Sequence, residues 1–192
     1  MIRICILGDI GSGKSYISKL FGCPVFNADK EVSRLYKNSK KAYKRLKKAL
    51  PKHVISFPVN KFQILKAIIS NKKNIKKIIK IIHPEVRIKL NNFVKKNKNK
   101  KAVILDIPLF LENKLKKKGD ILVFVEADKK EINKRLKERP NFNSKIFREF
   151  KKIQLSLEFK RKKSHFIIKN NFKSNYIKKN VKNILRKIIN ND

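Results

Sequence analysis

A chain of 192 residues, 41% of them apolar, is long enough for one compact domain with a real core, so a wholly disordered chain is excluded. Its only two cysteines, Cys5 and Cys23, cannot form a disulfide framework, which argues against a disulfide-rich secreted protein and favours a reduced, cytoplasmic one. No apolar run reaches membrane-spanning length, which argues against a membrane protein. The formal net charge of +38 has two interpretations: binding to nucleic acid or another polyanion, or a compositional drift toward Lys, Ile and Asn, whose codons are rich in A and T.

The elements expected in the first half of the chain begin with a short β-branched run, which is typical of a buried parallel strand. A glycine-rich loop and a helical stretch follow it directly. Farther on, apolar residues recur at helical spacing in two long segments that are separated by a loop with a proline at each end. The expected order is strand 2–7, loop 8–15, helix to about 21, strand 25–26, helix 30–50, loop 51–58 and one or two helices over 62–82.

The second half is expected to open with a helix break at His83-Pro84, with Pro84 in the first turn of the next helix. Asp128 is expected to cap a helix that ends near Arg139, and Ser144 to cap a long basic helix. The other expected elements are a basic turn at 95–101, strands at 102–105, 120–126 and 166–168, a loop at 140–143 and an amphipathic helix over 175–189. Because strands alternate with helices, the pattern predicts an α/β fold with a mostly parallel sheet.

The most specific pattern is G-x-x-x-x-G-K-S at Gly8 to Ser15, between a predicted strand and a predicted helix, where a phosphate-binding loop belongs. Glycines at these positions let successive backbone N–H groups converge on phosphate oxygens. The Lys14 ammonium can reach the β- and γ-phosphates, and the Ser15 hydroxyl can ligate Mg²⁺. Glycine is otherwise scarce in this chain, so a chance match is rare and the pattern predicts a site for a nucleoside triphosphate.

Acidic residues follow two of the predicted strands, at the sheet edge where parallel strands present ligand-binding groups. Asp29 is either a base for a hydroxyl group that attacks the γ-phosphate or the N-cap of the next helix, and spacing alone leaves both open. Asp106 either helps to hold Mg²⁺ or is a turn residue before Pro108. Glu112, on the same loop, either lines a substrate cleft or begins an exposed helix.

Arg135 and Arg139 stand four residues apart on one face of a predicted helix, just before the loop at 140–143. Since arginine binds phosphate oxygens bidentately, they are candidate phosphate ligands on a closing segment, and the alternative is a solvated helix face. His83 is interpreted as a structural histidine. The histidines and cysteines lack the spacing of a metal site.

Together these segments resemble the dephospho-coenzyme A kinase family almost from end to end. The phosphate loop is shared by many enzymes, but the other matching segments are more specific to this family. They are Asn27-Ala28-Asp29, Ile82-His83-Pro84-Glu85-Val86-Arg87, Asp106-Ile107-Pro108-Leu109-Phe110-Leu111-Glu112, Arg135 to Arg139, Gln154 to Lys160 and Phe166 to Asn171.

The resemblance implies a three-layer phosphate-loop kinase fold with a five-stranded parallel sheet, a helical insert that binds the acceptor and a short lid. Within a single domain, 1–192, it implies a nucleotide-binding core at 1–29, 100–139 and 164–192, an acceptor-binding insert at 30–99, and a lid with its following helix at 140–163. The implied reaction transfers the γ-phosphate of ATP, with Mg²⁺, to the ribose 3′-hydroxyl of dephospho-coenzyme A, the last step of coenzyme A synthesis. A monomer is favoured over an oligomer, and neither a specific nucleic acid nor a membrane is expected as a partner.

Carried over to this sequence, the resemblance makes Asp29 the catalytic base and gives Lys14 the task of stabilising the transferred phosphoryl group. The residues implied to bind ATP are Gly11, Ser12, Gly13, Lys14, Ser15, Tyr16, Arg135 and Arg139. Those implied to bind the acceptor are Asp29, His83, Arg87, Leu109 and Glu112, and those implied to hold Mg²⁺ are Ser15 and Asp106.

The chain departs from the family pattern at several positions. Asn27 stands in place of an aspartate, and Tyr16 in place of a threonine. Phe172 follows the last pair of asparagines, where a glycine is usual. Phe150 stands where a lid arginine is expected, and Lys151 is expected to substitute for that arginine.

Two other functions remain open from the sequence. Another phosphate-loop kinase, acting on a nucleotide or nucleoside, would phosphorylate a mononucleotide and ignore dephospho-coenzyme A. A basic nucleic-acid-binding protein would bind without sequence preference and with a steep salt dependence.

Overall fold

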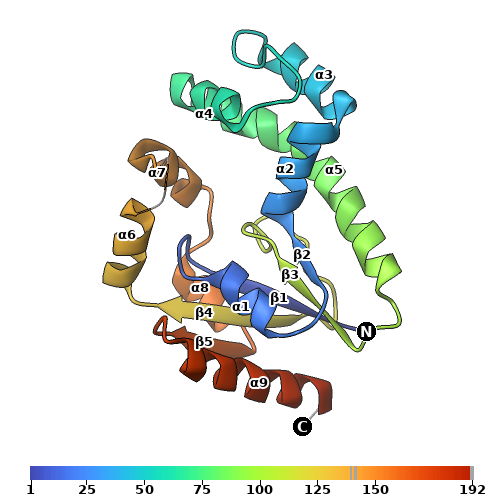
Figure 1. Cartoon of the computed structure of the whole chain (residues 1–192), viewed down its shortest axis with the longest axis vertical. Coiled ribbons are helices and arrows are strands. Elements are labelled where there is room, and N and C mark those ends of the chain that lie inside the picture. The colour runs from blue at the N-terminus through green and yellow to red at the C-terminus, as the bar shows by residue number, and fades with distance from the viewer. Residues whose placement is uncertain (139, 141, 191–192) are drawn as a thin grey trace. The chain divides into compact units, whose positions relative to one another are not determined.

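Figure 1 shows the computed structural model, which describes residues 1–138, 140 and 142–190. The chain divides into two compact units. We call the first, made of Met1–Asn27, Lys96–Phe142 and Lys151–Asp192, the sheet unit. The second, made of Ala28–Lys95 and Asn143–Phe150, is the helical unit.

The sheet unit contains a five-stranded, all-parallel sheet in the order β2-β3-β1-β4-β5. Its strands are β1 (Ile2–Gly8), β2 (Val25–Asn27), β3 (Ala102–Asp106), β4 (Ile121–Ala127) and β5 (Phe166–Asn170). All of β3 and most of β1 and β4 are buried, as expected of parallel strands that have helices on both faces. The predicted parallel α/β sheet is confirmed, and each predicted strand is present to within two residues.

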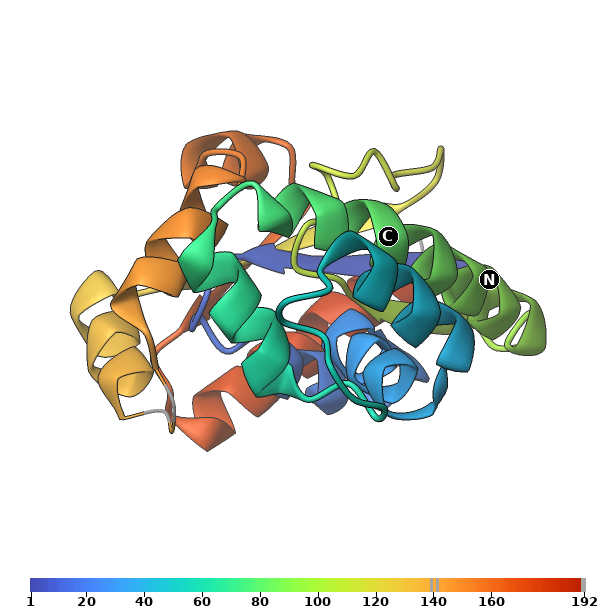
Figure 2. The ribbon, with the colours of Figure 1, turned by 90° about the horizontal axis from the view of Figure 1, so that it is seen from above.

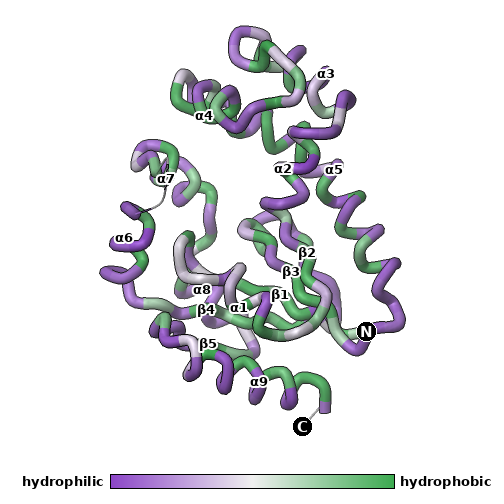
Figure 3. Tube along the Cα trace, in the orientation of Figure 1, coloured by the Kyte–Doolittle hydropathy of each residue, from purple (hydrophilic) through white to green (hydrophobic). Residues whose placement is uncertain are grey.

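Helices cover both faces of this sheet and give it three layers (Figure 2). On one face α1 (Lys14–Leu20) and α9 (Ser174–Asn190) pack against Ile4 and Ile6 through residues such as Ile17 and Ile177. Side chains alternate along β1, so Cys5 points to the other face, where α8 (Leu157–Lys162) contacts this strand. Figure 3 shows the alternation of hydrophobic and hydrophilic residues along α9 that this packing requires.

Helix α6 (Lys129–Lys137), which also belongs to the sheet unit, begins as predicted. The Asp128 carboxylate accepts hydrogen bonds from the N–H groups of Lys130 and Glu131, at 2.8 and 3.2 Å. The prediction of an N-cap at Asp128 is therefore confirmed. The end predicted for this helix, near Arg139, lies outside the described residues.

The helical unit contains α2 (Ala28–Asn38), α3 (Lys40–Ala49), α4 (Lys61–Ser70) and α5 (Asn74–Lys96). The single helix predicted over 30–50 is wrong, because the chain forms α2 and α3 there. Ser39 lies between them, and its hydroxyl accepts a hydrogen bond from the Ala42 N–H at 3.1 Å. Serine at this position starts a new helix by satisfying an N–H group that the first turn leaves without a partner.

The helix break predicted at His83-Pro84 is also wrong, because Pro84 lies inside α5. Proline removes one backbone hydrogen bond from a helix. Pro84 is exposed, and so is Lys80, whose carbonyl oxygen loses its donor, so water can solvate this oxygen. Buried side chains on both sides of Pro84, among them Ile82 and Leu90, keep the two halves of the helix packed on one core.

The long basic helix predicted after 143 is likewise two helices, α7 (Ser144–Lys152) and α8. Ser144 is the first residue of α7 and not its cap, because the side chain of Asn143 accepts the hydrogen bond from the Ile146 N–H at 3.0 Å. The Ser156 hydroxyl accepts from the Phe159 N–H at 3.1 Å and begins α8. Each new cap sets a helix start that the periodicity of the apolar residues does not mark.

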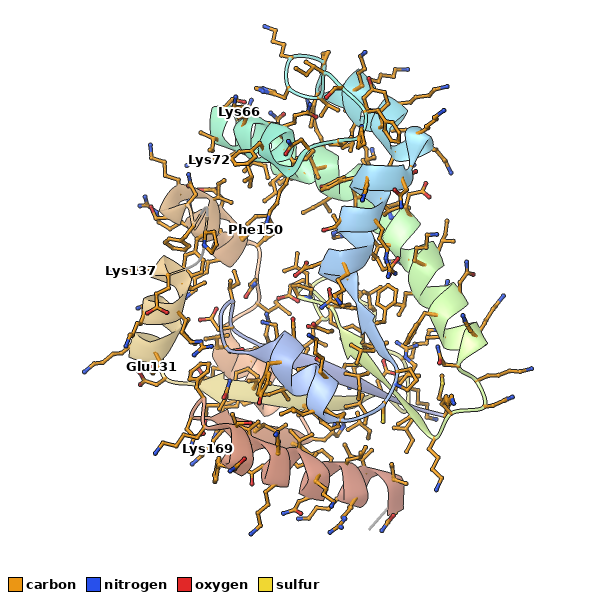
Figure 4. All side chains as sticks on the ribbon, in the orientation of Figure 1. Lys66, Lys72, Glu131, Lys137, Phe150 and Lys169 are labelled. Atoms are coloured by element: carbon orange, nitrogen blue, oxygen red, sulfur yellow. The ribbon has the colours of Figure 1, made fainter. Side chains whose placement is uncertain are left out.

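None of the described helices is both long enough and apolar enough to cross a membrane. Lysine side chains extend outward from the helices of each unit (Figure 4). Lys66, Lys72, Lys137 and Lys169, which are labelled there, are all exposed. Much of the positive charge therefore lies in solvent, where it is screened by water and salt.

Candidate phosphate-binding site

The loop between β1 and α1 requires glycine at two positions. Gly11 and Gly13 have φ angles of 88° and 89°, a region that residues with a side chain rarely adopt. A Cβ atom at Gly13 would lie 2.4 Å from Asn170 Nδ2, and one at Gly11 would lie 3.1 Å from side-chain atoms of Ile132 and Leu136. The loop therefore packs closely against the end of β5 and against α6.

The Lys14 ammonium group lies over this loop. Its Nζ donates to the carbonyl oxygen of Asp9 at 2.6 Å and to that of Gly8 at 3.3 Å. From the other side, Asn170 Nδ2 donates to the carbonyl oxygen of Ser12 at 2.7 Å. The Ser12 hydroxyl is buried and has no hydrogen-bond partner among the described residues. The loop thus holds the Lys14 ammonium group against its own backbone. The contact of Asn170 with the loop is one that sequence reasoning missed.

Asp9 is a second contact that sequence reasoning missed. It is an acid inside a loop whose pattern predicts anion binding, and it is 5% exposed. Its Oδ1 accepts a hydrogen bond from the Ile10 N–H at 2.7 Å, and its Oδ2 lies 3.3 Å from Lys151 Nζ. Lys151, which was expected to substitute for a lid arginine, therefore contacts the phosphate loop through Asp9.

The carboxyl ends of β2 and β3 bring Asn27 and Asp106 together. They are register partners in the sheet, and Asn27 Nδ2 lies 2.5 Å from Asp106 Oδ2. Asp106 is buried. Two carboxylates so close would repel each other, whereas an amide at 27 donates a hydrogen bond to the acid. The asparagine at this position is thus matched to Asp106.

Asp29 lies one residue into α2, in the helical unit, and is exposed. Because α2 begins at Ala28, Asp29 is in the first turn and is not the N-cap, so that alternative is wrong. His83 and Arg87 belong to the same unit, on α5, where His83 is half-buried and Arg87 is exposed.

Glu112 lies in a series of turns after β3 and does not begin a helix. Its Oε1 lies 2.7 Å from Lys160 Nζ and accepts a hydrogen bond from the Leu155 N–H at 3.0 Å. Lys160 is 1% exposed, which is rare for a lysine. The Glu112 Oε2 atom is buried without a hydrogen-bond partner among the described residues. Leu109, on the same turns, is half-buried.

Arg135 stacks on an aromatic ring beside the phosphate loop. Its guanidinium carbon is 4.4 Å from the centre of the Phe172 ring, a cation–π geometry. Phe172 has a φ of 60° and donates its N–H to Asn170 Oδ1 at 2.9 Å. This φ angle explains why a glycine suits the position. Ser15 and Tyr16, at the end of the phosphate loop in the first turn of α1, are exposed. The Tyr16 Oη atom lies 3.0 Å from Ser174 Oγ.

Arg139 lies outside the described residues. Within the described part of the chain, no group of three or more His, Cys, Asp or Glu side chains could hold a metal ion.

The chain is similar to known proteins over most of its length. The family model of dephospho-CoA kinase matches residues 2–175. The dephospho-CoA kinase of Wolbachia pipientis wMel is 34% identical over 187 residues, which cover 95% of each chain. A crystal structure of a Thermus thermophilus protein superposes with a TM-score of 0.77 at 25% identity and covers 97% of both chains. The structure of dephospho-CoA kinase from Campylobacter jejuni has a TM-score of 0.65 at 21% identity, covers 97% of this chain and 96% of that one, and supports the fold alone.

The chain thus combines a five-stranded parallel sheet and the loop at Gly8 to Ser15 with a family match that covers residues 2–175. This chain belongs to the dephospho-CoA kinase family.

Proposed function

We propose that this chain transfers the γ-phosphate of ATP to the ribose 3′-hydroxyl of dephospho-CoA and so forms CoA and ADP. The observation that carries the proposal is the phosphate loop with the Lys14 ammonium group held over it, in a chain whose family match covers 2–175. A kinase for a mononucleotide would share the loop, but the family match extends through the segments outside it.

The nucleotide is bound in this proposal by the loop and by the residues around it. Backbone N–H groups between Gly11 and Ser15 bind phosphate oxygens, and the Lys14 ammonium leaves its carbonyl contacts to neutralise the β- and γ-phosphates. Tyr16 and Arg135 are proposed as further ATP contacts, and the stacking of Arg135 on the Phe172 ring beside the loop supports this role for Arg135. Arg139 is proposed as a further phosphate ligand on the strength of the resemblance.

Mg²⁺ fits the oxygen groups that the chain offers. Mg²⁺ is usually bound through one or two protein oxygens, several waters and substrate phosphates, so a cluster of three acids is not needed. The Ser15 hydroxyl and the Asp106 carboxylate are the groups proposed to hold it. When bound, the ion supplies positive charge to the β- and γ-phosphate oxygens.

On the strength of the resemblance, His83, Arg87, Leu109 and Glu112 are proposed to contact the acceptor. Asp29 is proposed as the base. Its carboxylate takes the proton of the 3′-hydroxyl as that oxygen bonds to the γ-phosphorus, while the bond to the β,γ-bridging oxygen breaks and ADP leaves. Its exposure in the first turn of α2 leaves the carboxylate accessible to a substrate.

The test is CoA formation from ATP and dephospho-CoA, followed by mass. Asp29→Asn is expected to lower kcat by about 10²–10⁴-fold, the range for loss of a general base. Glu31→Gln, which removes an acid two residues farther along α2, is the matched control and should retain kcat to within a few-fold. Loss of only a few-fold in Asp29→Asn would contradict its role as base. Turnover of mononucleotides without turnover of dephospho-CoA would refute the proposed substrate.

We further propose that the enzyme works in the cytoplasm as a monomer. Light scattering during size-exclusion chromatography tests the second point, because a mass near the 22.6 kDa of one chain is expected.

A further inference from the structure

An acidic side chain inside an anion-binding loop is an electrostatic problem. The Asp9 side chain is only 7% exposed, so water screens its charge poorly. Its Oδ1 is held by the N–H group of Ile10, which fixes the carboxylate at the loop. A triphosphate bound to the same loop would be repelled by this charge unless a cation neutralised it.

Lys151 supplies a cation at that position. Its Nζ lies 3.3 Å from Asp9 Oδ2, and its side chain is 49% exposed. Lys14, the lysine of the loop itself, contacts the backbone carbonyl oxygen of Asp9 at 2.6 Å. The carboxylate therefore has its ion pair with a residue in the last turn of α7, far away in sequence.

We propose that Lys151 is a positioning residue for the triphosphate: it neutralises the Asp9 carboxylate and so keeps the potential of the loop favourable for anions. Lys151 acts on the nucleotide through Asp9, so the effect depends on the charge of the ligand. This inference goes beyond the proposed function, since it concerns nucleotide binding and holds whichever acceptor the enzyme uses.

The first measurement is equilibrium binding of ATP and AMP by calorimetry, without acceptor. Lys151→Met should weaken ATP binding, because it leaves the Asp9 charge without its cation. Since Lys151 is half exposed and solvent screens its charge, we expect this loss to be limited to about tenfold. AMP, which carries less charge, should lose much less. Raising the salt concentration should shrink the tenfold difference between the variant and the unaltered chain, because salt screens the repulsion between Asp9 and ATP. A purely structural role would weaken both ligands alike.

The second measurement separates the ion pair from the loss of a positive charge. Lys145→Met removes an exposed lysine from the same helix and is the matched control, with an expected change in ATP affinity of less than twofold. Lys151→Arg keeps the charge and should bind ATP like the unaltered chain. Asp9→Asn keeps the shape of the side chain and removes its charge. Combined with Lys151→Met, it should restore ATP affinity to within about threefold.

Three results would overturn the inference: equal effects of Lys151→Met and Lys145→Met, equal losses for ATP and AMP, or no recovery in the double variant. All of them are obtained from nucleotide binding alone. Failure of the enzyme to phosphorylate dephospho-CoA would therefore bear on the proposed function and leave these outcomes unchanged.

Discussion

Replacing Lys160 with methionine is expected to destabilise the chain strongly. Lys160 is 1% exposed, its Nζ lies 2.7 Å from Glu112 Oε1, and the side chain of Glu112 is 10% exposed. Methionine fills much of the same volume but leaves the Glu112 carboxylate with the hydrogen bond from the Leu155 N–H and no cation. Removal of one partner from a buried ion pair typically costs about 3–5 kcal/mol, because the remaining charge is left without compensation.

Thermal unfolding followed by circular dichroism measures this loss. For a chain of this size, each kcal/mol lowers the melting temperature by roughly 2–4 °C, so Lys160→Met should melt about 6–20 °C lower. Adding Glu112→Gln removes the stranded charge, and the double variant should regain most of the stability.

The matched control lies two residues farther along α8. Lys162 Nζ is 2.8 Å from Glu158 Oε1, but the two side chains are 73% and 75% exposed. Water and salt screen such a pair, so Lys162→Met should cost less than about 0.5 kcal/mol. If Lys160→Met were no more destabilising than Lys162→Met, the burial of the pair would not matter and the reasoning would be refuted.

Three further predictions follow from burial and backbone conformation. Gly13→Ala puts a methyl group 2.4 Å from Asn170 Nδ2 and should reduce ATP affinity at least tenfold, as measured by calorimetry. Gly22 is the control, because it has a similar φ of 65° but open space around it. Gly22→Ala should leave ATP affinity unchanged and lower the free energy of unfolding by only about 1–2 kcal/mol. Burial raises the pKa of the Cys5 thiol far above its ordinary value, so in the folded chain at pH 8 an aromatic disulfide reagent should react with the partly exposed Cys23 alone, and with both thiols in denaturant. Burial raises the pKa of Tyr36 to about 12, so the folded chain keeps a proton that the unfolded chain loses near pH 10. The unaltered chain should therefore lose stability as pH rises from 9 to 11. Tyr36→Phe should lose less stability over the same range, as measured by urea unfolding.

The strands were predictable because their signal is local. A parallel strand buried on both faces is a short apolar run whatever it packs against, and 102–105 and 121–125 are such runs. Helix boundaries were less predictable, because they depend on competition between a cap and the packing around it. Ser39 ends a periodic pattern that would otherwise continue, and Pro84 fails to end one because buried residues hold both sides of it.

The candidate site divides in the same way. Gly8 to Ser15 is contiguous in sequence, so its pattern was sufficient to predict the loop. The contact of Asn27 with Asp106 follows once the strand register is known. The partners of Asp9 and Glu112 could not be identified, because the chain offers dozens of lysines with the same local sequence character. Only the tertiary structure selects among them.

The few acids therefore show where the large positive charge contributes to the structure. Three acids with little exposure each have a basic partner at 2.7–3.3 Å: Asp9 with Lys151, Glu112 with Lys160 and Asp120 with Arg3. An exposed lysine can replace another polar residue at little cost, since its charge is screened by water, and compositional drift can therefore accumulate lysines on helix faces. A lysine opposite a buried acid cannot be lost in this way, because its removal leaves a charge in a poorly solvated place. Neutral substitutions of other exposed lysines should accordingly be tolerated, whereas neutral substitutions of Lys151 and of the buried Lys160 should not.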